Sequence, residues 1–155
     1  MVGGEALFSD GGPVTAAAGY SGTPLPKKLG LKDGQRVLFL SLPVELAELR
    51  SARAFAEVRD AQWDAWRGSK GWDFVHGFTA SRGVLEDNAR PLLEAITRDG
   101  VIWISWPKKA SKVPTDITED VIREVVLPIG LVDIKVAAVS EIWSGLKLMI
   151  RKELR

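Results

Sequence analysis

The clearest pattern of hydrophobic positions lies in the C-terminal third of the chain. Residues 101–106 form a continuous apolar run that ends at Pro107, which has no N–H to give to a sheet. Such a run predicts a strand buried on both faces, and we take it as the central strand. After Thr118, apolar residues recur with the spacing i, i+3, i+4, i+7, which predicts a helix with one apolar side. These residues are Ile122, Val125, Val126 and Ile129.

The same region predicts a strand hairpin after this helix. Asp116 and Glu119 have the spacing of a reciprocal helix cap, and Pro128 and Gly130 are expected to end the helix. Residues 131–139 then predict a strand. Ser144 and Gly145 allow a tight reversal into residues 146–151, where apolar and polar side chains alternate. We expect this last strand to be antiparallel, so that the hairpin adds an antiparallel edge to the sheet.

The first half of the chain alternates between strand and helix patterns. Strands are predicted at 36–42, 54–58 and 72–79, and apolar helical stripes follow Pro43 and cover 82–97. A short helix capped by Asp60 would present Trp63 and Trp66 on one side. This alternation predicts an α/β fold with three layers, a mostly parallel sheet and a C-terminal antiparallel hairpin.

Composition and charge limit the domain number and the classes of partner. The chain has 155 residues, of which 46% are hydrophobic, and this suits a single domain at 19–155 behind a flexible arm at 1–18. The 21 basic and 20 acidic side chains give a net charge of +1, so we do not expect binding to nucleic acid or to a membrane. The sequence has no cysteine and opens without a signal peptide, so we expect a cytoplasmic protein.

Three segments resemble a known family. They are GYSGTPLPKKLGLKDGQRVLFL at 19–40, WPKKASKVPTDITEDVIREV at 106–125 and GLVDIKVAAVSEIWSGLKLM at 130–149. They resemble a family of small bacterial proteins described only as a domain of unknown function, with the motifs GYSGTPLxKKLG and WPKK. The resemblance implies a bacterial protein without an assigned activity.

The order of the predicted elements also resembles class I methyltransferases, with a reduced Rossmann-like fold. Those enzymes hold the methionine part of S-adenosylmethionine against a glycine-rich turn after the first strand. Here that turn contains Leu42 and Pro43 and no glycine. The resemblance therefore implies the fold, and we expect neither S-adenosylmethionine nor any other cofactor to bind.

A basic loop after the central strand is the predicted ligand site. Lys108, Lys109 and Lys112 follow the carboxyl end of that strand and precede the helix that begins near Thr118. Open α/β sheets bind ligands at this place, and backbone N–H groups of a helix N-terminus favour anions. We expect this lysine loop, which includes Thr115 and Thr118, to bind a small anionic ligand. A solvated surface loop is the alternative.

Other candidate residues favour structural roles. His76 is the only histidine and lies between Phe74 and Phe78 on one strand face, which indicates a core residue more than a catalytic base. The carboxylates near Thr118 suit helix capping better than metal binding. Trp63 and Trp66 suit core packing, and the alternative is a patch for a protein partner or a second copy of the chain.

Taken together, these patterns favour a non-catalytic ligand-binding or interaction module with an anion-binding lysine loop. The alternative is a divergent methyltransferase-like transferase that binds a nucleotide-like cofactor by an unusual route. A plugged cleft would favour the module.

Overall fold

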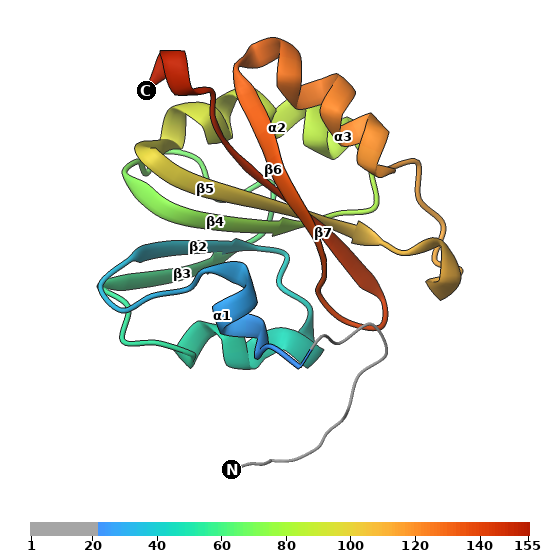
Figure 1. Ribbon diagram of the computed structural model, residues 1–155, viewed down its shortest axis with the longest axis horizontal. Helices are drawn as coiled ribbons and strands as arrows, with labels where there is room; N and C mark the ends of the chain where they lie inside the picture. Colours follow the sequence, from blue (N-terminus) through green and yellow to red (C-terminus); the bar gives the residue numbers. More distant parts are fainter. Residues whose placement is uncertain (1–21) are drawn as a thin grey trace.

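The computed structural model describes residues 22–155, so the arm expected at 1–18 lies outside the described residues. A six-stranded sheet with the order β3-β2-β4-β5-β7-β6 crosses the molecule (Figure 1). Its strands are β2 (Arg36–Leu40), β3 (Glu57–Ala61), β4 (Trp72–Phe78), β5 (Ile96–Pro107), β6 (Leu131–Ala138) and β7 (Trp143–Ile150).

The strand directions confirm the predicted parallel sheet. β2 is parallel to β3 and β4, and β4 is parallel to β5, whereas β7 is antiparallel to both β5 and β6. The hairpin forms the predicted antiparallel edge of the sheet, in which β7 lies between β5 and β6 and β6 is the outermost strand. Leu146 and Leu148 of β7 are fully buried, which an inner strand requires. The reversal occurs before Trp143, so Ser144 and Gly145 belong to the strand.

Helices cover both faces of the sheet and complete the three layers. The helices α2 (Arg82–Ala95) and α3 (Glu119–Val126) pack on one face, and α1 (Leu25–Leu29) and the 3-10 helix η2 (Val44–Ser51) pack on the other (Figure 1). Each face has its own buried apolar cluster, with Trp106 on the α2 face and Trp103 on the α1 face. Every helix within 22–155 is too short or too polar to cross a membrane.

Side-chain caps fix where the two long helices begin. The hydroxyl of Ser81 accepts the N–H of Val84 at the start of α2, and Thr118 accepts the N–H of Val121 at the start of α3. The predicted cap by Asp116 was wrong. Its carboxylate accepts the N–H of Arg82 and thereby joins the loop before α3 to the start of α2.

The segment between β2 and β4 departs most from the prediction. The second strand begins at Glu57, later than the predicted 54–58, and Asp60 lies inside it and caps no helix. Trp66 is 1% exposed and donates to Asn88 in α2, so this loop covers the sheet where a helix was expected. Local propensity predicted the helix, and burial of the tryptophans against the sheet decided the outcome.

Candidate functional site

The carboxyl ends of β2, β3 and β4 meet at one edge of the sheet. The chain leaves β2 to form β3 on one side and then crosses to form β4 on the other side. In open α/β sheets such a switch point is where ligands bind, outside the carboxyl ends of the strands. Ser41, Gln62 and Thr79 each follow directly after one of these strands, and we call these three residues the switch-point edge.

Ser41 has an unusual backbone conformation at this edge. Its φ is 54°, and among residues 22–155 Lys112 is the other non-glycine residue with a positive φ. Its N–H donates to the carbonyl of Ala61 at 2.9 Å, and its hydroxyl donates to Gln62 Oε1 at 3.0 Å. Left-handed backbone outside glycine costs free energy and is concentrated at functional sites. Ser41 and Gln62 therefore bring a hydroxyl and an amide together at the switch point.

S-adenosylmethionine does not fit the turn after β2. The Leu42 side chain packs against the apolar cluster on the α1 face, and Pro43 leads into η2, which is a 3-10 helix. The turn therefore lacks both the glycines that allow close backbone approach and the N-terminus of an α-helix. Asp60, near the end of β3, forms an ion pair with Arg50 of η2, so its carboxylate already has a partner.

Trp63 covers the end of β4 on the α2 face. Its Nε1 donates to the carbonyl of Phe78 at 2.8 Å, and a Cβ placed on Gly77 would lie 2.4 Å from its Cη2 atom. Only glycine leaves room for the indole ring there. This contact was not predicted from the sequence, and a glycine inside a buried strand is the signal that could have revealed it.

A pocket lies between α1 and η2, the 3-10 helix that begins three positions after Ser41 in the sequence. It has a volume of about 500 Å³, and η2 contributes residues from Glu45 onward, four positions after Ser41. Leu25, Leu46 and Leu49 give it apolar walls, and Glu48 adds a second carboxylate. Small-molecule sites have this size and are mostly apolar. Two glutamates in the lining disfavour a ligand that would bring a phosphate here.

His76 forms a buried pair with Ser105 inside the α1-face cluster. Its Nε2 lies 2.7 Å from Ser105 Oγ, its ring stacks on Phe78 at 4.2 Å, and its Nδ1 has no partner. Burial lowers the pKa of His76 to about 3, so the imidazole is neutral at physiological pH. Both side chains are fully buried, which confirms the prediction of a core histidine.

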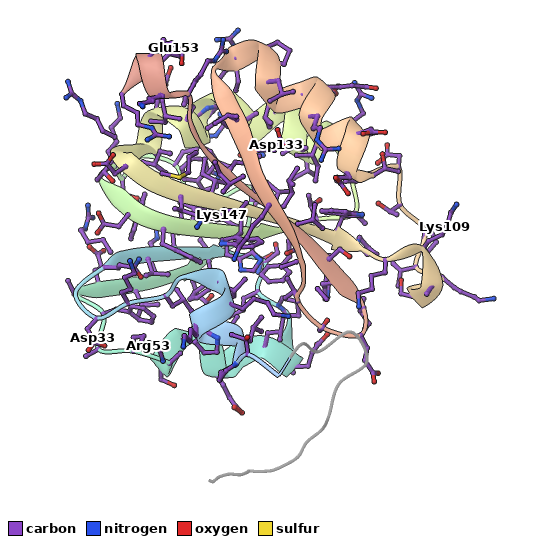
Figure 2. The ribbon with its side chains drawn as sticks, in the orientation of Figure 1. Asp33, Arg53, Lys109, Asp133, Lys147 and Glu153 are labelled. Atoms are coloured by element: carbon purple, nitrogen blue, oxygen red, sulfur yellow. The ribbon has the colours of Figure 1, made fainter. Side chains whose placement is uncertain are left out.

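The lysine loop lies between β5 and α3. Lys108 is half-buried, whereas Lys109 is exposed and projects away from the body of the molecule (Figure 2). The hydroxyl of Thr115 donates to the carbonyl of Ala80, and that of Thr118 caps α3. Lys112 is exposed and adopts a left-handed backbone conformation. The structure places these residues in one loop, and their binding of an anion stays a prediction.

The predicted patch of tryptophans is largely internal. Trp66 lies in the core, as core packing predicted, and Trp63 is half-buried against Gly77. A partner that binds through these two residues stays a prediction. Among residues 22–155, no group of histidine, cysteine, aspartate and glutamate side chains could hold a metal ion.

Comparisons with solved structures identify the fold. No protein-family model and no curated protein matches the chain, so membership of the bacterial family stays a prediction. An S-adenosylmethionine-dependent methyltransferase from Aquifex aeolicus is similar, with a TM-score of 0.64, 16% identity, and coverage of 80% of this chain and 86% of that chain. The N-methyltransferase NodS from Bradyrhizobium japonicum is similar with a TM-score of 0.56 and 8% identity, and the match covers 77% of this chain and 88% of that chain. A TehB-like methyltransferase from Corynebacterium glutamicum is similar with a TM-score of 0.52 and 12% identity, and the match covers 82% of this chain and 85% of that chain. The chain therefore has the methyltransferase-like Rossmann fold.

Proposed function

We propose that this protein is a divergent transferase of methyltransferase-like fold that binds a nucleotide-like ligand at the switch-point edge. The likeness to methyltransferases supports this proposal more than it supports a non-catalytic module. Because the turn after β2 does not suit S-adenosylmethionine, the ligand binds by another route. The hydroxyl of Ser41 and the amide of Gln62 hydrogen-bond its ribose, and the neighbouring pocket takes an apolar group.

The conformation of Ser41 is the observation that carries the proposal. A serine held at φ 54° is less stable there than glycine, so a structural role alone does not explain its side chain. Its hydroxyl instead points to Gln62, which is exposed and free to exchange this partner for a ligand. Neutral donors and acceptors suit ribose hydroxyls, and the glutamates of the pocket favour a nucleoside over a ligand with several phosphates.

Replacing Ser41 by glycine tests the proposal without straining the fold. We expect adenosine to bind the parent protein in calorimetry and Ser41→Gly to weaken the binding about two- to tenfold, the loss expected for one hydrogen bond. The control is Lys112→Gly, which relieves the same backbone strain away from the switch-point edge. The proposal is wrong if adenosine, adenosine monophosphate and S-adenosylhomocysteine all fail to bind, or if Ser41→Gly binds adenosine as the parent does.

The second candidate is the non-catalytic anion-binding module predicted from the lysine loop. The departures from the methyltransferase site favour it, since the turn lacks glycine, Asp60 is paired and Trp63 covers the end of β4. This candidate requires phosphate binding by the parent with no nucleoside binding. Loss of that binding in the double variant Lys109→Ala/Lys112→Ala would place the site in the lysine loop.

A further inference from the structure

A group of lysines gathers on the α1 face of the sheet, around β6 and β7. Lys135 and Lys147 are directly paired across these antiparallel strands. The Lys28 Nζ donates to the carbonyl of Ala138 at the end of β6, at 3.1 Å, and the backbone N–H of Lys108 donates to the carbonyl of Ile142 in the β6–β7 turn. Lys32 follows α1. We call these residues the lysine face: Lys28, Lys32, Lys108, Lys135 and Lys147.

The fold holds these positive charges close together. Like charges directly opposite each other on paired strands destabilise a sheet, and Lys135 and Lys147 are such a pair. Burial, and then the charges of Lys135 and Lys32, lower the pKa of Lys147. Burial also lowers the pKa of Lys28, with the charges of Lys108 and Lys135 as further causes. Lys147 lies over the middle of the sheet, far from the projecting Lys109 (Figure 2).

Four of these five lysines have no carboxylate partner among the described residues. Among residues 22–155, Lys32, Lys108, Lys135 and Lys147 form no ion pair. Asp133 of β6 pairs with Arg123 of α3 on the other side of the sheet. The repulsion between Lys135 and Lys147 is thus built into the strand register, with no counter-charge paired to either lysine among residues 22–155, and a bound anion would relieve it.

We propose that the lysine face binds a small phosphate-bearing anion with at least two negative charges, such as a diphosphate. Lysine ammonium groups recognise phosphate as point charges. Lys28, Lys135 and Lys147 lie in α1, β6 and β7, and Lys32 and Lys108 lie in the loops after α1 and β5, so the site is a product of the fold. The whole chain carries a net charge of only +1, which favours a compact anion over a long polyanion such as nucleic acid. The site is distinct from the switch-point edge and does not depend on the function proposed there.

Lysine-to-methionine variants test this site, because methionine keeps the aliphatic length and removes the charge. With inorganic pyrophosphate at low salt, we expect calorimetric binding and a rise in Tm for the parent. Lys147→Met and Lys135→Met should each weaken binding about tenfold, the lower end for a hydrogen bond to a charged group. Without pyrophosphate, Lys147→Met should have a higher Tm than the parent, because the like-charge contact is gone. If Lys147 had only a structural role, Lys147→Met would have a lower Tm than the parent.

Two control variants separate this site from general charge effects and from the lysine loop. Lys152→Met makes the same charge change in the C-terminal 3-10 helix, and Lys109→Ala/Lys112→Ala removes the exposed charges of the loop. Both should bind pyrophosphate as the parent does. Comparing adenosine diphosphate with inorganic pyrophosphate shows whether the bound diphosphate comes from a nucleotide or is free. Binding of either probe supports the site.

The proposal is overturned if pyrophosphate and adenosine diphosphate neither bind nor raise the Tm of the parent. Equal pyrophosphate affinity in the parent and in Lys147→Met would also overturn it. Binding of a single-stranded oligonucleotide without binding of either small phosphate would overturn it in favour of a polyanion.

Discussion

Acid should destabilise this protein through its one histidine. His76 is fully buried, and its pKa in the folded protein is lowered to about 3 from 6.5. Below pH 6.5 the unfolded chain binds a proton that the folded protein does not bind. The stabilisation is therefore complete above pH 6.5 and is lost as the pH falls toward 3. Between pH 7 and pH 4.5 the loss should be about 2.5 kcal/mol, from 2.303RT for each pH unit below the unfolded pKa.

Urea unfolding followed by tryptophan fluorescence would measure this loss. The comparison variant is His76→Gln, which keeps a polar partner for Ser105 and does not titrate. Carboxylates titrate in both proteins, so the difference between their unfolding free energies isolates His76. If His76→Gln folds poorly, the double variant His76→Leu/Ser105→Ala removes both polar groups and serves the same comparison.

The expected advantage of the parent over His76→Gln at pH 7 shrinks by about 2.5 kcal/mol at pH 4.5. A difference that stays constant with pH would refute the reasoning. Chemical shifts of the imidazole protons provide an independent check, because they should not titrate in the folded protein between pH 7 and pH 4.5. A midpoint near 6.5 would mean that the ring reaches solvent.

Three further predictions concern packing, the lysine loop and the cofactor. Gly77→Ala should lower the unfolding free energy by about 1–3 kcal/mol, because the added methyl group would overpack against Trp63. Adding Trp63→Leu to this variant should restore part of the lost stability. An unchanged urea midpoint for Gly77→Ala would contradict the contact. If the lysine loop is the anion site, Lys108→Ala/Lys109→Ala should abolish binding of inorganic phosphate with little change in stability, since surface lysines contribute little; retained phosphate binding would place the site elsewhere, and unfolding of this variant would show a structural role. Calorimetry should detect no S-adenosylmethionine binding in the micromolar range, and micromolar affinity would disprove our interpretation of the turn after β2.

Periodic patterns in the sequence predicted most of the fold. The apolar run at 101–106 became the centre of β5, and the stripe that contains Ile122 and Val126 became α3. These predictions held because burial on one or both faces leaves a local signature. The position of β7 between β5 and β6 has no such signature, since strand order depends on which non-local edges pair.

The candidate sites divide in the same way. The lysine loop was visible because its residues lie close together in the sequence. The lysine face brings together Lys28 and Lys135, which are 107 positions apart (135 − 28), so it appears only after folding. Trp63 seemed to belong to an amphipathic helix with Trp66, but it packs on Gly77. The strain at Ser41 was also invisible, because serine gives no sequence signal for a left-handed turn.

The place of β7 also has a consequence for how the chain folds during its synthesis. β6 is synthesised before β7, yet within the described part of the chain its one strand neighbour is β7. Until β7 is made, β5 keeps an open edge of unpaired N–H and carbonyl groups, and β6 has no strand to pair with. An open edge of this kind is where another chain can pair and start aggregation. A chain in which β7 has not yet paired is therefore open to association with other chains along β5.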